Sequence, residues 1–304
     1  MIYTLTFSPS IDYVVHLDHA YEPGKINMVT ENHYFYGGKG VNVSQVLLGL
    51  GVENTALGFV AGFTGREIED GLKKKGCITD FIHLKEGHSR INIKVKDALE
   101  SEINSEGPII DDDSMMQLFD KVARITKDDI LVLAGRLPKA LPTNMFARLI
   151  EQTDYENTRI IVDTAGENLF NVLPYHPFLI KPNHEELGQL FNEQFSPFDK
   201  ERIVSAASLL QEKGARNVLV SLASEGAIMV CEDGRIFSLP APNGIVRNSV
   251  GSGDSMVAGF IAGYLNNFDY MDAFCMGLAA GSATAFVEGL AGGQEIMELY
   301  RFVR

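Results

Sequence analysis

The sequence has few cysteines and an excess of acidic over basic residues, and both features exclude classes of protein. Its three cysteines, Cys77, Cys231 and Cys275, lie far apart, and no C-x-x-C motif occurs. That usage excludes a disulfide framework and is typical of reduced thiols in the cytoplasm. Lysine and arginine number 26 against 40 acidic residues, a formal net charge of −14. A nucleic acid or an anionic membrane would need a basic face, so we expect neither as a partner.

Long apolar runs are also missing. No stretch of about 18 uninterrupted apolar residues occurs, so the sequence predicts no membrane-spanning helix. The N-terminal stretch MIYTLTFSPSIDYVV lacks the basic region and long apolar core of a signal peptide. We therefore expect a cytoplasmic protein. The seven histidines have no partners at metal-ligand spacing, and we assign them no catalytic role.

Short apolar runs alternate with helical patterns along most of the chain. The runs IYTLTF, DILVLA, RIIVD, PFLIK and NVLVSL are too uniformly apolar for strands with one wet face. They predict buried parallel strands. Between them, apolar residues recur at the i, i+3 and i+4 spacing of amphipathic helices. The alternation predicts a single α/β domain over residues 1–304, with a central, mostly parallel sheet covered by helices on both faces.

Two segments, residues 13–36 and 89–104, depart from this alternation. In RINIKVK the apolar Ile91, Ile93 and Val95 share one side of a strand, and the polar residues share the other. This pattern predicts a half-exposed strand, unlike the buried ones. We expect the two segments to form a small separate sheet that acts as a lid.

Polar, glycine-containing or acidic turns follow the five buried runs. They read SPSID, GRLP, TAGEN, PNHEE and LASEG. Since parallel strands end at the same edge of a sheet, and ligands bind beyond that edge, the five turns predict a cleft there.

The stretch NSVGSGDSMVAGF carries the strongest chemical signal. Gly251 and Gly253 precede an apolar helical stripe, so open backbone N–H groups and the helix dipole together make an anion site. Asp254 could be a simple N-cap, but a cap does not need flanking glycines. We favour a general base that faces a transferring phosphoryl group. A dinucleotide fingerprint is excluded because Met256 stands where its third glycine is required, and no Walker A loop occurs.

A second glycine-rich stretch, YGGKGVN, precedes another predicted helix. Lys39 and Asn42 share one face of its first turn. The alternative is a flexible turn before an exposed lysine. Lys39 together with Arg90 could supply the local cations that an anionic substrate needs in a protein of negative charge.

The third stretch, IKPNHEELGQLF, places Asn183 and Glu186 at i, i+3 on a helix start. These residues could orient a Mg²⁺–phosphate complex through water molecules. Spacing alone favours a capping asparagine with a glutamate at the third helical position.

Together the stretches resemble the ribokinase-like, or PfkB-type, family of carbohydrate kinases. GGKGVN, KPNHEE and VGSGDSMVAGF occur in the family's order, and the resemblance spans essentially the whole chain. TFSPSID, SRINIKVK and LAGRLP are similar to the branch of 1-phosphofructokinases and tagatose-6-phosphate kinases, and more so to the former. The resemblance implies ATP-dependent phosphorylation of D-fructose 1-phosphate, with tagatose 6-phosphate as the alternative acceptor. A catalytically idle sugar-phosphate sensor is the less favoured reading.

The resemblance also implies roles for individual residues. Asp254 would be the base, and the backbone of Gly251, Ser252 and Gly253 would hold the transferring phosphoryl group. The residues implied for the sugar phosphate are Asp12, Gly37, Gly38, Lys39, Asn42 and Arg90, with Lys39 and Arg90 on its phosphate. Those implied for ATP are Lys181, Asn183, Glu186, Ser221 and Gly226, with Asn183 and Glu186 also holding Mg²⁺ through water. A homodimer formed through the lid is implied as well.

We expect Asp254 to need no raised pKa, because a helix N-terminus favours the ionised form. Three residues depart from the family pattern: Ser252 replaces alanine, Arg136 replaces serine and Ala165 replaces a polar residue. The first should matter little because backbone amides act there. The other two bear on substrate choice.

Overall fold

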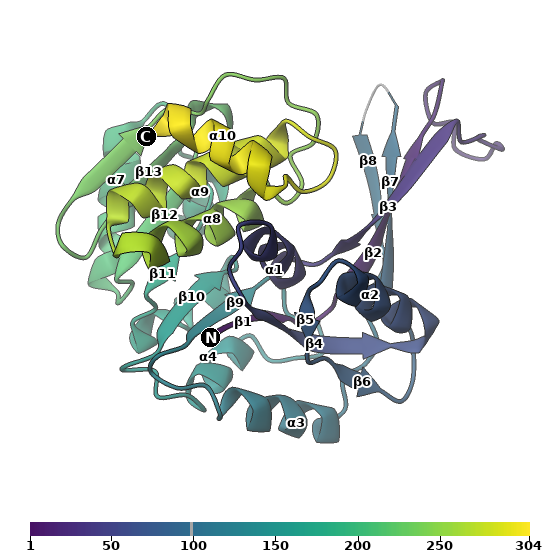
Figure 1. Ribbon diagram of the computed structural model, residues 1–304, viewed down its shortest axis with the longest axis horizontal. Helices are drawn as coiled ribbons and strands as arrows, with labels where there is room; N and C mark the ends of the chain where they lie inside the picture. The colour runs from purple at the N-terminus through teal and green to yellow at the C-terminus, as the bar shows by residue number, and fades with distance from the viewer. Residues whose placement is uncertain (98–99) are drawn as a thin grey trace.

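The computed structural model describes residues 1–97 and 100–304, and a ten-stranded sheet forms its centre (Figure 1). The strand order is β14-β13-β12-β11-β10-β9-β1-β4-β5, with β6 paired to β4. The pairs are parallel except those of β13 with β12 and β14. The strands span Ile2–Thr6 (β1), Thr55–Ala61 (β4), Ile78–Thr79 (β5), Ile82–Leu84 (β6), Ile130–Ala134 (β9), Arg159–Asp163 (β10), Leu179–Ile180 (β11), Asn217–Ser221 (β12), Ala227–Val230 (β13) and Ile236–Leu239 (β14).

The strand order reverses beside β1. The chain passes from β1 to β4 on one side and later reaches β9 on the other, so Leu5 is in register with both Leu57 and Leu133. At such a reversal the loops that follow neighbouring strands diverge, and a crevice opens outside their carboxyl ends. The topology therefore provides a cleft at the edge where the sequence predicts one.

Helices cover both faces of this sheet. They span Lys39–Gly49 (α1), Gly62–Lys74 (α2), Asp112–Val122 (α3), Met145–Ile150 (α4), Glu167–Phe170 (α5), His184–Phe191 (α6), Lys200–Glu212 (α7), Ser252–Asn267 (α8), Tyr270–Ala285 (α9) and Gly293–Val303 (α10), with short 3-10 turns at Leu173–Tyr175 and Ala223–Glu225. Along β9, Leu131 and Leu133 join the core beneath α3, α4 and α7, whereas Ile130 and Val132 join the core beneath α1, α8 and α9. Apolar side chains on both faces confirm the predicted mostly parallel, doubly covered sheet.

The five predicted apolar runs each contain a strand of this sheet, namely β1, β9, β10, β11 and β12. Strand β4 was not predicted, although all seven of its residues are buried. Gly58 interrupts the apolar run of β4, and a Cβ there would overlap the carbonyl oxygen of Thr6. Close approach of the two backbones explains why glycine stands in this strand.

A second sheet of four strands projects from one side of the molecule (Figure 1). Its order is β3-β2-β7-β8, with β2 parallel to β7 and the other pairs antiparallel. The strands span Ser10–His16 (β2), Glu31–Gly37 (β3), Arg90–Lys96 (β7) and Glu100–Asn104 (β8). They lie in or beside the segments predicted for a lid, of which residues 98–99 fall outside the described residues.

The small sheet turns its polar face toward the main body. On β7, Asn92 and Lys94 are 4% and 6% exposed, whereas the apolar Ile91 is 40% exposed. On the outward face, Tyr34, Tyr13, Ile93 and Ile103 form a row across all four strands. The strand is half-exposed as predicted. Its apolar side faces away from the protein at Ile91, whereas Val95 on the same side is 6% exposed.

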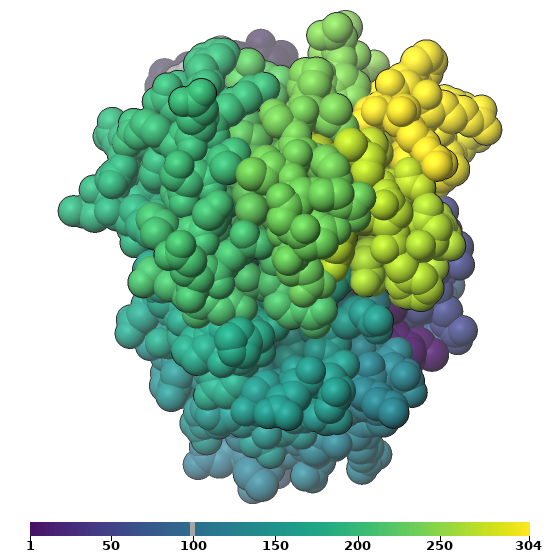
Figure 2. All heavy atoms as spheres, turned by 90° about the vertical axis from the view of Figure 1, so that its left-hand side faces the viewer, coloured from purple at the N-terminus to yellow at the C-terminus, as the bar shows by residue number. Residues whose placement is uncertain are grey.

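The side of the molecule opposite the small sheet is formed by the middle and later parts of the chain (Figure 2). Only the edges of the N-terminal segments are visible there, behind the green and teal atoms of that surface. Among the helices of the described residues, none combines the length and the apolar character needed to cross a membrane.

Candidate active site

A cavity of about 960 Å³ lies between the carboxyl ends of the large-sheet strands and the polar face of the small sheet. Fourteen of the residues that the sequence singled out line it together: Asp12, Gly38, Lys39, Asn42, Arg90, Lys181, Asn183, Glu186, Ser221, Gly226, Gly251, Ser252, Gly253 and Asp254. Gly37 lines an adjoining cavity of about 420 Å³, which shares Asp12 and Asn42 with the first. Segments far apart in sequence thus meet at one site.

Asp254 lies in the first turn of α8. The helix N-cap is Gly251, in a left-handed conformation with φ of 83°, and a Cβ there would lie 2.7 Å from Leu290. Asp254 does not cap the helix; its Oδ2 accepts a hydrogen bond of 2.7 Å from Nδ2 of Asn42 on α1. The carboxylate is therefore held in the cavity wall, and the N-cap alternative does not apply to it.

The pKa of Asp254 is higher than that of an ordinary aspartate. Burial and then the neighbouring Asp163 raise this pKa to about 6, against the opposing effects of Lys39, Asn42 and Lys181. The expectation that the helix N-terminus would keep the pKa low was wrong, because loss of solvation outweighs the helix dipole. A carboxylate with a pKa near 6 is still ionised at neutral pH and is a stronger base than a solvated aspartate.

Asp163, at the end of β10, was not among the predicted site residues. Its side chain is 1% exposed and lies between two lysines, with Oδ2 at 3.2 Å from Nζ of Lys39 and Oδ1 at 3.4 Å from Nζ of Lys181. Burial opposes ionisation, but Lys181 and Lys39 outweigh it and lower the pKa of Asp163. The only sequence signal was a charged residue at the end of the otherwise buried run RIIVD.

The two lysines reach the anion-binding start of α8. A Cβ on Gly253 would lie 3.0 Å from Nζ of Lys181, so the ammonium group sits against this glycine. Burial alone would lower the pKa of Lys39, but Asp163, Asp254 and Glu186 together raise it. Within the described part of the chain, the buried Oγ of Ser252 has no hydrogen-bond partner. Ammonium groups and open backbone amides therefore converge where a phosphoryl group could be held.

The small sheet contributes a second group of polar residues. Oδ1 of Asp12 accepts hydrogen bonds from Oγ of Ser10 at 2.9 Å and from Nδ2 of Asn92 at 2.8 Å. A Cβ on Gly37 would overlap Oδ2 of Asp12, which explains a glycine at this position. Burial lowers the pKa of Arg90, and Asp12 counters that effect. Asn92 and Lys94 also line the cavity, although the sequence analysis gave them no role.

The turn before α6 contains the predicted capping pair. Oδ1 of Asn183 accepts the Glu186 N–H at 2.7 Å, and Oε2 of Glu186 accepts the Asn183 N–H at 2.9 Å. This capping box confirms the reading that spacing alone favoured. The backbone of Asn183 also forms an isolated parallel β-bridge with Ser221. The turn before α6 therefore lies beside the turn that ends at Gly226, whose φ is 96°.

The same pair fits a weakly coordinated Mg²⁺. Across residues 1–97 and 100–304 no cluster of three or more His, Cys, Asp or Glu side chains could hold a metal ion. The capping box does not use the second carboxylate oxygen of Glu186. One amide and one carboxylate suit magnesium, which keeps most of its waters and takes few direct protein ligands. Arg136 and Ala165 depart from the family pattern in a way that bears on substrate choice, and Arg136 lines the cavity.

Comparisons with known proteins consistently find kinases of sugars or sugar phosphates. The profile of the pfkB family carbohydrate kinases matches residues 5–297. The chain is 39% identical to a 1-phosphofructokinase of Bacillus subtilis over 98% of its length and 97% of the relative's. It is 36% identical to a D-tagatose-1-phosphate kinase of Bacillus licheniformis, over 95% and 94% of the two chains. The crystal structure of phosphofructokinase-2 from Escherichia coli with substrates and products superposes with a TM-score of 0.92 at 28% identity, over 99% of both chains.

Proposed function

The chain belongs to the pfkB family of carbohydrate kinases, and we propose that it phosphorylates D-fructose 1-phosphate with ATP to give D-fructose 1,6-bisphosphate and ADP. The observation that carries this proposal is the buried carboxylate of Asp254 at the anion-binding start of α8, bound to Asn42. A base beside an anion hole is the arrangement that phosphoryl transfer to a hydroxyl requires. The name of the B. subtilis relative supports fructose 1-phosphate as the acceptor.

In the proposed reaction, the C6 hydroxyl oxygen of the sugar attacks the γ-phosphorus of ATP. The bond between that phosphorus and the bridging oxygen of the β-phosphate breaks, and ADP leaves. The hydroxyl proton passes to Asp254, which is ionised at neutral pH because its pKa is about 6. The backbone amides of residues 251–253 stabilise the charge on the transferring group.

ATP would occupy the part of the cavity beside α6 and β12, with Lys181, Asn183, Glu186, Ser221 and Gly226 as its contacts. Mg²⁺ bound with the nucleotide would neutralise phosphate charge, and Asn183 and Glu186 would hold it through water molecules. We infer the cytoplasm as the compartment, consistent with three separate, reduced cysteines.

The sugar would lie against the small sheet. Asp12, Gly37, Gly38 and Asn42 remain the predicted contacts to its hydroxyls, and Arg90 the predicted contact to its phosphate. Asn92 holds Asp12 in place at 2.8 Å and so supports this part of the site. The proposed lid role of the small sheet follows from this division, because the sheet would close over the sugar.

A homodimer through the small sheet is the assembly that we propose. The outward row of Tyr34, Tyr13, Ile93 and Ile103 is apolar, and Tyr34 and Ile103 are more than half exposed. A second copy of the chain would remove this face from water.

Steady-state kinetics with a panel of sugars test the substrate assignment. The panel contains D-fructose 1-phosphate, D-tagatose 1-phosphate, D-tagatose 6-phosphate, D-fructose 6-phosphate, fructose and ribose, each with Mg·ATP. We expect kcat/KM for fructose 1-phosphate to exceed the others by about tenfold or more, roughly 1.4 kcal/mol of transition-state preference.

Each other result has a distinct meaning. The name of the B. licheniformis relative makes tagatose 1-phosphate a specific alternative acceptor. Tagatose 1-phosphate carries its phosphate on the same carbon as fructose 1-phosphate. A lead for either tagatose ester or for fructose 6-phosphate would change the acceptor and keep the mechanism. A lead for an unphosphorylated sugar would overturn the role of Arg90. No sugar-dependent ADP release would favour a sugar-phosphate sensor.

A further inference from the structure

Asp163 is a buried carboxylate that contacts two lysines of the cavity and has no part in the proton transfer described above. We propose that Asp163 is a positioning residue that aims the ammonium groups of Lys39 and Lys181 at the transferring phosphoryl group and keeps both from pairing with Asp254. The proposal rests on the proposed kinase activity and deepens it.

The geometry supplies the first argument. Each oxygen of Asp163 faces a different lysine, at 3.2 Å for Lys39 and 3.4 Å for Lys181. The three residues come from the start of α1, the end of β10 and the turn after β11, so one side chain fixes two cations from separate elements. Lys181 also sits against Gly253, which places the cluster at the anion-binding start of α8.

The burial of the cluster supplies the second argument. Asp163 is 1% exposed and Lys181 is 4% exposed, and a buried charge that loses its partner is strongly destabilised. Without Asp163, the carboxylates left near the two lysines are Asp254, with which both interact electrostatically, and Glu186, which acts on Lys39. A lysine paired with Asp254 would occupy the oxygen that must accept the hydroxyl proton.

The neighbours of Lys39 indicate which phosphate it serves. Its ammonium group interacts electrostatically with Asp163, Asp254 and Glu186. Asp254 is the proposed base and Glu186 a proposed ATP contact, so Lys39 belongs to the part of the cavity where the phosphoryl group would be transferred. Arg90 interacts instead with Asp12 on the small sheet. We therefore separate two cations that the sequence analysis grouped together: Lys39 acts on the transferring group, and Arg90 acts on the phosphate that the sugar already carries.

The test begins with wild-type kinetics and then compares Asp163→Asn, Lys39→Ala and the double variant. Asp163→Asn should lower kcat about 10–100-fold, the loss expected when charged groups are misplaced by about 1 Å. The KM for sugar phosphate should change less than about threefold. Because Asp163 acts through the lysines, the double variant should be little worse than Lys39→Ala alone, far from the sum of the two effects.

The pH dependence of kcat/KM gives a readout that a merely structural role would not move. Asp254 faces Asp163, Lys39, Lys181 and Asn42. Removing the negative charge of Asp163 leaves Asp254 with its cationic neighbours, so the acidic limb of the profile should shift to lower pH.

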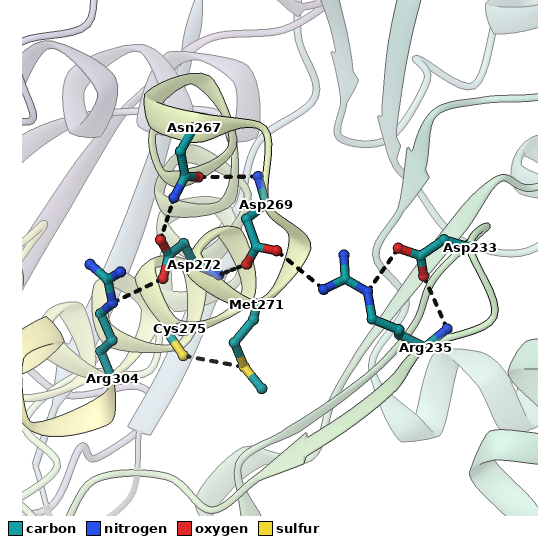
Figure 3. A network of polar contacts seen from close by, with 8 residues as sticks. All are labelled: Asp233, Arg235, Asn267, Asp269, Met271, Asp272, Cys275 and Arg304. Atoms are coloured by element: carbon teal, nitrogen blue, oxygen red, sulfur yellow. Dashed lines mark hydrogen bonds and ion pairs between the residues drawn. The ribbon is translucent and has the colours of Figure 1, made fainter.

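Asp272→Asn is a matched control. Asp272 is also a buried aspartate paired with a cation, since its Oδ1 accepts from Nε of Arg304 at 3.0 Å, but it lies on α9 in a separate polar network with Asn267 (Figure 3). This variant should lower the melting temperature and leave kcat and the acidic limb unchanged.

The possible outcomes distinguish a failure of the kinase proposal from a failure of the positioning role of Asp163. An inactive wild type would refute the kinase proposal itself. An active wild type with an Asp163→Asn variant that matches the control, or with strictly additive effects, would overturn the positioning role. So would recovery of Asp163→Asn activity at high Mg²⁺, which would assign Asp163 to the metal.

Lys39→Ala alone decides the matter if Asp163→Asn does not fold. A loss confined to kcat and to the KM for ATP supports the proposal. A rise only in the KM for sugar phosphate would show that Lys39 binds the phosphate of the sugar, and would overturn it.

Discussion

The two sheets of this molecule use the same alternation of side chains in opposite ways. The large sheet is mostly apolar on both faces, which lie under helices; Thr4 in the middle of β1 is bonded to Ser44, and the polar residues that line the cavity lie where the strands end. The small sheet buries its polar face, with Asn92 and Lys94 against the cavity, and exposes the apolar Ile91 and Ile103. A strand pattern therefore shows that two faces differ, and only the tertiary contacts show which of them is inside.

The two sheets contribute different groups of residues to the site. Asp163 ends one large-sheet strand, Lys181 follows another, and Asp254 lies in the first turn of a helix packed on that sheet, so these groups belong to the large-sheet side of the site. Asp12, Arg90 and Asn92 belong to the small sheet, which we propose recognises the sugar. Substitutions on the large-sheet side should lower kcat, and those on the small sheet should raise KM for the sugar.

Asp254→Asn should have the largest effect. Loss of the base should lower kcat about 10²–10⁴-fold while the protein still folds. Steady-state ADP release with fructose 1-phosphate measures this change, and Asp272→Asn serves as the control. Turnover near that of the wild type would remove Asp254 from the mechanism and with it the division between the sheets.

The same variant should be more stable than the wild type at neutral pH. The folded state raises the pKa of Asp254 from 3.8 to about 6, so the stability that this group contributes at low pH is lost as pH rises through 6. Asparagine carries no charge to desolvate, so the free energy of unfolding at pH 7 should rise on the order of 1–3 kcal/mol. Denaturant unfolding at pH 7 and pH 4 would show a gain confined to the higher pH, and an equal gain at both would contradict the pKa argument.

Arg90→Ala tests the small-sheet side. A charge-assisted contact to phosphate contributes about 1.5–3 kcal/mol, so the KM for sugar phosphate should rise about 10–150-fold. The KM for ATP should stay near its wild-type value. Arg235→Ala, which changes an arginine in the network of Figure 3, is the control. Equal increases for both substrates would mean that Arg90 only shapes the lid.

The activity should fall on the acidic side of about pH 6. Asp254 must be ionised to accept the hydroxyl proton, and its pKa of about 6 makes kcat/KM at pH 5 roughly tenfold lower than at neutral pH. A pH profile over the range in which the fold is stable measures this limb. Its persistence in Asp254→Asn would assign the limb to another group.

The smallest effect is expected on the apolar side of the small sheet. Ile103→Ser should weaken the proposed homodimer about fivefold, since an average interface side chain contributes about 1 kcal/mol or less. Sedimentation over a concentration series measures the association. A wild type that stays monomeric at all concentrations would rule out this interface, and a dimer unaffected by Ile103→Ser would place it elsewhere.

The sequence and its resemblance to the kinase family together predicted the class of fold and fourteen of the residues that line the cavity. Glycine-rich stretches and strand-end turns are local signals, whereas Asp12, Lys181, Ser221 and Gly226 were implied by the resemblance. The sequence did not predict the Lys39–Asp163–Lys181 cluster, because the contacts arise only when β1, β9, β10 and β11 are placed side by side. It also failed for the pKa of Asp254. That value depends on burial and on Asp163, which is 91 positions away in the chain, whereas the helix dipole is visible in the local pattern.

The inward polar face of the small sheet bears on how the substrate specificity of such an enzyme changes. Arg90, Asn92 and Lys94 line the cavity from a sheet that lies outside the two cores packed on the large sheet. Substitutions at these positions leave both cores intact, but they remove the contacts of Asn92 with Asp12 and of Lys94 with Glu102. A gene library randomised at these three codons should yield variants with altered sugar preference, and those that leave Asp12 without its partner Asn92 should melt at a lower temperature than the parent.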